Sequence, residues 1–100
     1  MKRESECKIM ANGSKWWKLD GIVHREDGPA VEFTDGYKVW YKHGKRHRED
    51  GPAVDYSNGH KSWYLNGQYL RVRESINDPE LKRKYPELIE SMIIYSVHNS

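Results

Sequence analysis

The side chains best suited to chemistry occur in one tetrapeptide, His-Arg-Glu-Asp, which is present twice, at residues 24–27 and 47–50. A histidine beside carboxylates can act as a general base or as a metal ligand. A catalytic group is needed once, however, whereas a structural group is needed in every copy of a repeated unit. A third histidine would fall at Leu70, which can pack but cannot bind a metal. We therefore expect His24 and His47 to be structural, with no catalytic residue, metal site or cofactor and no enzymatic activity.

A second group of polar residues is basic and could contact a phosphate backbone. Basic side chains interleaved with exposed aromatic rings are typical of surfaces that bind single-stranded nucleic acid. The carboxylates of the two tetrapeptides offset this charge, and lysine or arginine on a sheet edge also prevents edge-to-edge pairing. Nucleic-acid binding is therefore kept as the alternative function. The residues of this basic stripe are Lys42, Lys45, Arg46, Arg48, Arg71 and Arg73.

The composition predicts a folded domain whose core is built from aromatic side chains. The 100 residues include 4 Trp and 7 Tyr, and the formal net charge is +2. Each large aromatic side chain can bury roughly 150–250 Å². No apolar run approaches the ~18 residues that a membrane span requires. Residues 1–14 lack the apolar segment of a secretion signal, and the lone Cys7 fits a reducing compartment, so we expect a cytoplasmic protein.

An internal repeat of 23 residues dominates the sequence. Residues 24–46 and 47–69 are identical at 13 of 23 positions, and a degraded copy precedes them, so the repeats span residues 8–70. Asx-Gly dipeptides recur at 12–13, 35–36 and 58–59, and a second series of turn dipeptides recurs at 20–21, 43–44 and 66–67. Such dipeptides favour two-residue type I′ hairpin turns. The sequence therefore predicts an antiparallel meander of repeated β-hairpins with about six short strands.

The register of these hairpins decides which side chains share a face of the sheet. A two-residue loop at Asp35-Gly36 pairs Val31 with Trp40, and its copy pairs Val54 with Trp63. One face is then expected to carry Trp17, Trp40 and Trp63 together with Val31, Val54, Phe33 and Tyr56. The opposite face mixes aromatic rings with charge, which resembles the composition of protein interfaces. The partner-binding residues predicted there are Trp16, Tyr37, Tyr41, Tyr64, Glu32 and Asp55.

The C-terminal third changes from strand to helix patterning, with a helical cap expected over residues 76–97. Asp78 is a good N-cap and is followed by Pro79 and Glu80, which suit the first turn of a helix. Because Pro86 should interrupt the helical run, we expect one helix over about 79–84 and a second over about 86–95. Their apolar stripe needs a partner, and the tryptophan row is the expected one.

Residues 37–59 resemble a MORN repeat (membrane occupation and recognition nexus). The shared elements are the 23-residue period and the stretch containing Trp40, Gly44, Lys45, His47, Gly51 and Asn58-Gly59. The resemblance covers about residues 12–70 and implies a β-hairpin array used for binding. Proteins with such repeats include scaffolds, membrane-associated proteins and small bacterial antitoxin-like proteins, and the His-Arg-Glu-Asp-Gly-Pro-Ala form looks like small bacterial and phage proteins.

Together these observations predict a single domain over residues 1–100, mainly β with C-terminal α, in which one or two helices cap an antiparallel meander. The expected function is that of a non-enzymatic protein-interaction module, specifically a small bacterial or phage antitoxin-like or inhibitor protein that binds a partner protein. The alternative is a nucleic-acid-binding protein that uses the basic stripe. Self-association stays open, and the sequence does not name the partner.

Overall fold

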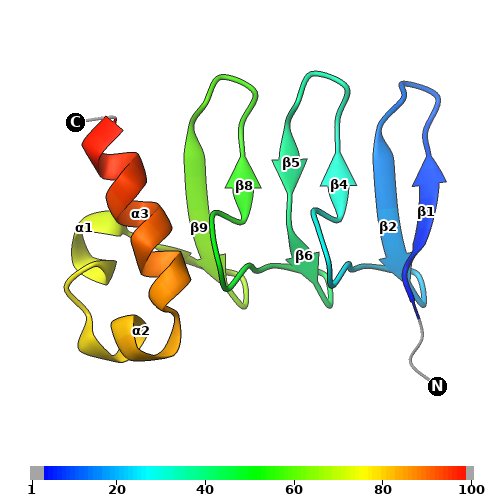
Figure 1. Ribbon diagram of the computed structural model, residues 1–100. Coiled ribbons are helices and arrows are strands. Elements are labelled where there is room, and N and C mark those ends of the chain that lie inside the picture. Colours follow the sequence, from blue (N-terminus) through cyan, green and yellow to red (C-terminus); the bar gives the residue numbers. More distant parts are fainter. Residues whose placement is uncertain (1–3, 99–100) are drawn as a thin grey trace.

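The computed structural model describes residues 4–98 and shows a row of antiparallel hairpins with helices at one end (Figure 1). The molecule is flat, with principal extents of 40 × 34 × 18 Å. The predicted fold class, mainly β with C-terminal α, is confirmed. The strands are β1 (Glu6–Ile9), β2 (Lys15–Leu19), β3 (Ile22–Val23), β4 (Val31–Glu32), β5 (Lys38–Val39), β6 (Tyr41–Lys42), β7 (Lys45–Arg46), β8 (Val54–Asp55), β9 (Lys61–Leu65) and β10 (Gln68–Leu70).

The larger sheet has the order β1-β2-β4-β5-β8-β9-β10, with β3 also paired to β2, and a second sheet consists of β6 and β7. All of these pairings are antiparallel. Each repeat contributes one long strand, and in the second repeat it is divided into β5 and β6 at Trp40. The sheet therefore repeats every 23 residues, as the sequence does.

The turns that follow the long strands have the predicted two-residue form. In the turn at 43–44, His43 has a φ of 51° and Gly44 a φ of 77°, and the turns at 20–21 and 66–67 have the same pair of positive values. Positive φ at both central residues is the requirement of a type I′ turn. This prediction is confirmed, and so is the register it sets, because Lys42 lies opposite Lys45 and Trp63 lies opposite Leu70.

The other turn series differs from the prediction, because its loops have three residues and not two. Val31 lies opposite Val39, and Val54 lies opposite Ser62, one position away from the predicted Trp40 and Trp63. Only the glycines of this series have positive φ, for example 98° at Gly36. The side chain preceding each glycine accepts a hydrogen bond from the N–H two residues further on, and this Asx turn favours a three-residue loop that ends on glycine.

A one-residue change of register moves every affected side chain to the other face of the sheet. Val31, Phe33, Val54 and Tyr56 therefore lie on the face opposite the tryptophan row, which corrects the sequence prediction. Glu32 and Asp55 change faces in the other direction and lie beside the tryptophans. We call the two sides the tryptophan face, defined by Trp17, Trp40 and Trp63, and the aromatic face, defined by Trp16, Phe33, Tyr37, Tyr41, Tyr56, Tyr64 and Tyr69.

Small residues separate the three large rings of the tryptophan face. The Trp17 N–H donates to the Ala30 carbonyl at 2.8 Å, and the Trp40 N–H donates to the Ala53 carbonyl at 2.7 Å. Ala30 and Ala53 are fully buried. Cys7, the counterpart of these alanines, lies opposite Trp17. The row therefore alternates a small residue with a tryptophan across the sheet, which leaves room for the indole rings.

Three helices complete the chain: α1 (Val72–Ser75), α2 (Pro79–Lys84) and α3 (Pro86–His98). Asp78 caps α2 as predicted, because its carboxylate accepts hydrogen bonds from the N–H groups of Glu80 and Leu81. The prediction of two helices separated near Tyr85 is correct, although α3 extends to His98. The four-residue helix α1 was not predicted, and its N-terminus has no side-chain cap.

Two small hydrophobic clusters lie on opposite faces of the sheet. On the tryptophan face, Trp63 packs against Leu88, Ile89 and Met92 of α3, and its indole N–H donates to Ser91 Oγ at 2.9 Å. On the aromatic face, the other cluster consists of three valines surrounded by half-buried rings. The helices therefore cover Trp63, and Figure 1 shows them at the β9 end of the sheet, away from β1 and β2.

Replacement of Trp63 by alanine should lower the free energy of unfolding by about 3–5 kcal/mol, because it removes a fully buried ring that joins the sheet to α3. Tyr69 is 59% exposed and makes one ring contact, with Tyr64, so Tyr69→Ala should cost only about 0.5–1.5 kcal/mol. Denaturant melts of the two variants measure the difference. Equal losses would contradict the packing of α3 on Trp63.

Candidate functional site

Each histidine of the repeated tetrapeptide holds a turn of the next hairpin. His24 Nδ1 accepts the backbone N–H of His43 at 2.9 Å, and His47 Nδ1 accepts the N–H of Asn66 at 2.8 Å. Both rings are buried, with 3% and 7% of their surface exposed. The donors are the first residues of the two type I′ turns. We refer to this contact as the histidine–turn hydrogen bond.

The other ring nitrogen of each histidine meets the glutamate two residues on. His24 Nε2 lies 2.9 Å from Glu26, and His47 Nε2 lies 3.0 Å from Glu49. Because Nδ1 accepts, the neutral ring carries its proton on Nε2 and donates it to the carboxylate. Partial desolvation raises the pKa of Glu26, but hydrogen bonds from His24 and Lys42 outweigh it, so this pKa lies below its ordinary value. The glutamates therefore fix the tautomer that the histidine–turn hydrogen bond requires.

The arginines of the tetrapeptide cover the tryptophans that α3 does not reach. The guanidinium of Arg25 lies 4.0 Å from the ring centre of Trp17, and that of Arg48 lies 4.0 Å from that of Trp40. Such cation–π contacts contribute about 0.5–2 kcal/mol, depending on how far they are desolvated. The third position, Arg71, is exposed and pairs with Glu74 at 3.7 Å. Trp63 is instead covered by α3, so no arginine is needed there.

The remaining residues of the loop hold each arginine in place. Arg48 Nε donates to Asp50 at 2.9 Å, and its NH1 group donates to the Pro52 carbonyl at 3.1 Å. Arg25 repeats both bonds. A Cβ atom on Gly51 would lie only 2.8 Å from the Arg48 guanidinium carbon, so a larger residue there would displace the guanidinium from this position. Every side chain from His47 to Asp50 therefore has a structural partner.

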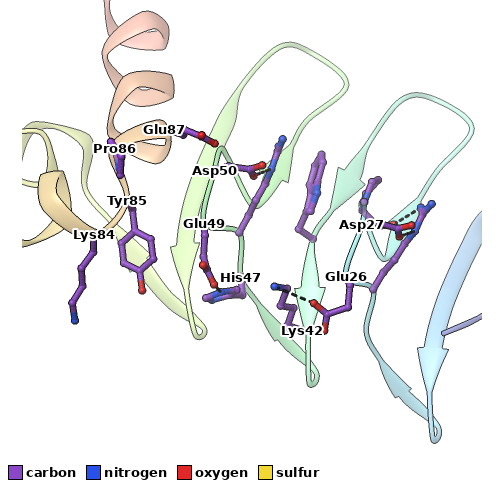
Figure 2. A pocket seen from close by; sticks show the side chains of 15 residues that line it. Glu26, Asp27, Lys42, His47, Glu49, Asp50, Lys84, Tyr85, Pro86 and Glu87 are labelled. Carbon is purple, nitrogen blue, oxygen red and sulfur yellow. Dashed lines mark hydrogen bonds and ion pairs between the residues drawn. The ribbon is translucent and has the colours of Figure 1, made fainter. Parts of the chain in front are cut away.

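The tetrapeptide loops also line a groove. This groove has a volume of about 710 Å³ and runs between the two loops and the junction of α2 with α3 (Figure 2). Lys84, Tyr85 and Glu87 form its helical side. In residues 4–98, no three His, Cys, Asp or Glu side chains are grouped to hold a metal ion. The chemistry of the groove is that of paired charges.

The six residues of the predicted basic stripe do not form one surface. Lys42 pairs with Glu26 at 3.3 Å and Arg48 with Asp50 at 2.9 Å on the tryptophan side, whereas Arg46 lies over Tyr64 on the aromatic face. Lys45 is exposed in β7, and Arg71 and Arg73 are exposed around α1. The structure therefore distributes the stripe over both faces and one end of the sheet.

Four of the six predicted partner-binding residues do share a surface. Trp16, Tyr37, Tyr41 and Tyr64 all pack against the buried valine cluster of the aromatic face. The rings of Trp16 and Tyr37 also contact those of Phe33 and Tyr56, with centre-to-centre distances of 6.2 Å for Trp16–Phe33 and 5.3 Å for Phe33–Tyr37 and Tyr37–Tyr56. Phe33, Tyr56 and Tyr69 were not named as site residues. Phe33 and Tyr56 were assigned to the wrong face because the three-residue length of the loops could not be predicted.

Arg46 is the charged member of this ring cluster. Its NH1 group donates to the Tyr64 hydroxyl at 3.2 Å, and its guanidinium lies 5.3 Å from the ring centre of Tyr64. Hydrogen bonding to Tyr41, and then to Tyr64, raises the pKa of Arg46. Burial raises the pKa of the Tyr37 phenol. The aromatic face therefore presents neutral phenols around a permanent positive charge.

Glu32 and Asp55, the other two predicted partner-binding residues, belong to a charged row on the tryptophan face. Lys15, Glu32, Lys38, Asp55 and Lys61 lie opposite one another on successive strands, with alternating sign. Lys61 Nζ lies 3.0 Å from Asp55. Opposite charges on neighbouring strands contribute roughly 0.2–1 kcal/mol per pair. Asp55 therefore has an ion-pair partner within the sheet, and Glu32 lies on the strand between Lys15 and Lys38.

Replacement of His47 by alanine should lower the free energy of unfolding by about 1–3 kcal/mol, because the Asn66 N–H loses its acceptor. The matched control is His60→Ala, since His60 is exposed and should cost less than about 0.5 kcal/mol. Denaturant melts give both values. Amide exchange should also become faster at Asn66 in the His47 variant, and an unchanged rate there would contradict the role of the ring.

No family model, no curated protein and no solved structure matches the chain. Among residues 4–98, no helix is both long enough and apolar enough to cross a membrane.

Proposed function

We propose that the chain is a non-enzymatic protein-interaction module and that its aromatic face binds a partner protein. The observation that carries the proposal is that this face presents a cluster of aromatic rings that the helices do not cover. Five aromatic side chains pack against three buried valines, Tyr56, Tyr69 and Arg46 lie beside those rings, and no residue of the described helices belongs to that cluster. Tyrosine, tryptophan and arginine are the residues enriched at the centres of protein interfaces.

The rings of this face are held in fixed positions before any partner arrives. Tyr37 is in contact with both Phe33 and Tyr56, and Tyr64 is in contact with Tyr69 and Arg46. Aromatic side chains with two rotatable bonds lose little conformational entropy when they enter an interface. Pre-organised side chains reduce the cost of binding. A small domain can therefore reach useful affinity through such a surface.

The chemistry of the tetrapeptide loops supports a binding role over a catalytic one. Their histidines, arginines and acids are bonded to one another or to the backbone. A protein that binds without turnover can act by occupying a surface of its partner. The resemblance to MORN repeats adds the specific proposal of an antitoxin-like or inhibitor protein of bacterial or phage type.

The test uses two neighbouring exposed residues of β10 that point to opposite faces. Tyr69 lies on the aromatic face opposite Tyr64, whereas Gln68 lies on the tryptophan side. Capture of a partner from lysate by tagged chain should be reduced by Tyr69→Asp and, more strongly, when Tyr56→Asp is added. Gln68→Asp adds the same charge one residue away and should leave capture unchanged.

Nucleic acid is the alternative ligand, and the salt dependence of the binding affinity distinguishes it from a protein partner. Affinity for a single-stranded oligonucleotide should fall by about 0.7 log units per log unit of salt for each phosphate contacted. Steep salt-dependent oligonucleotide binding, lost in the Tyr69 variant and accompanied by no specific protein capture, would replace the protein-interaction proposal. Equal capture by the Tyr69 and Gln68 variants would exclude the aromatic face as the binding surface.

A further inference from the structure

The outer edge of β1 is an open hydrogen-bonding edge. β1 is the last strand of the sheet, and within residues 4–98 it pairs with β2 alone (Figure 1). The Met10 N–H donates to the Ser14 carbonyl at 2.8 Å, so Met10 bonds toward the β2 side. Bonded and non-bonded residues alternate along an antiparallel strand. Cys7 and Ile9 therefore direct their backbone N–H and C=O groups outward.

We propose that this edge pairs with the same edge of a second copy of the chain, antiparallel and with Cys7 opposite Cys7. The proposal is independent of the partner suggested for the aromatic face. A strand related to itself by a two-fold axis satisfies the outward groups of both copies at once. The pairing would join the two sheets edge to edge, with like faces on the same side.

Two steps select this register. The outward groups of β1 belong to Cys7 and Ile9, so only registers that place odd positions opposite odd positions form the backbone bonds. With Cys7 opposite Cys7, Glu6 of each copy lies opposite Lys8 of the other. A shift in one direction places Glu6 opposite Glu6, and a shift in the other places Lys8 opposite Lys8. Opposite charges stabilise such a pair and like charges destabilise it.

The pattern also continues the charges already present in β2. Glu6 lies opposite Lys18, and Lys8 lies opposite Trp16. In the proposed pair, Glu6 would therefore lie between Lys18 of its own chain and Lys8 of the second copy. On the other face, Cys7 and Ile9 are both exposed, with Ile9 at 65%, and pairing would cover part of that apolar surface. Because a four-residue strand buries little area, the dimer is expected to be weak and concentration-dependent.

Two charge reversals test the register directly. In a dimer of the Glu6→Lys variant, the new lysine lies opposite Lys8, and in a dimer of the Lys8→Glu variant, the new glutamate lies opposite Glu6. Each variant alone should dimerise about tenfold more weakly than the parent chain, because two attractive pairs become repulsive. In a mixed dimer of the two variants, both lysines of one chain lie opposite both glutamates of the other. An equal mixture should therefore recover dimer formation. Lys45→Glu, a charge reversal at an exposed site on another strand, is the matched control.

Sedimentation equilibrium between about 10 µM and about 1 mM, the range suited to weak association, measures dimer formation for every sample. A parent chain that stays monomeric over this range would overturn the proposal. So would a Lys8→Glu variant that dimerises as well as the parent, or a mixture that does not recover. Thermal unfolding checks that each variant is folded. Lys8→Glu alone still decides the register if Glu6→Lys proves unfolded.

Oxidation of Cys7 provides a second readout. Opposed residues of a bonded antiparallel pair have Cα atoms about 5.5 Å apart, which is within the Cα range of a disulfide, and a small shift of the two edge strands brings the Cβ atoms from about 5.5 Å to the ~4 Å that the bond requires. Diamide takes up the two electrons and two protons that the pair of thiols releases. Cross-linking should be fast in the parent and in the mixture but slow in Lys8→Glu alone. Equal cross-linking rates in all three would indicate random collision and would overturn the register.

Discussion

The arrangement of the hairpins depends on one type of buried contact, the hydrogen bond that a backbone N–H of the next turn donates to a histidine ring. The type I′ turn needs its first residue in the left-handed region, where His43 and Asn66 both lie. Their N–H groups then point into the sheet and need an acceptor. A histidine 19 residues earlier supplies this acceptor, and the hydrogen bond fixes the position of one hairpin relative to the next.

The rest of the tetrapeptide follows from this contact. A buried histidine that must accept on Nδ1 needs a partner for Nε2, and the glutamate provides it. The loop that returns the chain to the sheet leaves a tryptophan partly uncovered, and the arginine covers it while Asp and the proline carbonyl hold the guanidinium. Charged side chains thus complete the core of a domain that has few aliphatic residues.

The repeat, the helices α2 and α3 and the type I′ turns could be predicted because their signals are local: a 23-residue period, Asp78 before Pro79, and Gly44 after His43. The register of the other loops could not, since Asp35-Gly36 suits both a two-residue and a three-residue loop. The choice depends on the Asp35 side chain, which bonds to the Tyr37 N–H. In the next repeat the Asn58 side chain bonds to the His60 N–H in the same way, and these two loops place Glu32 and Asp55 on the tryptophan face instead of the aromatic face.

Leu70 gives the array a direction. It occupies the histidine position, yet 19 residues further on the chain has reached α3 and not another turn. Leu70 packs instead with Trp63 and α3. A 23-residue unit inserted before Leu70 could form the histidine–turn hydrogen bond with its neighbours. A unit inserted after Leu70 would lack the histidine that accepts the N–H of its turn. Elongation by duplication of the 23-residue unit is therefore possible on one side of this leucine and blocked on the other.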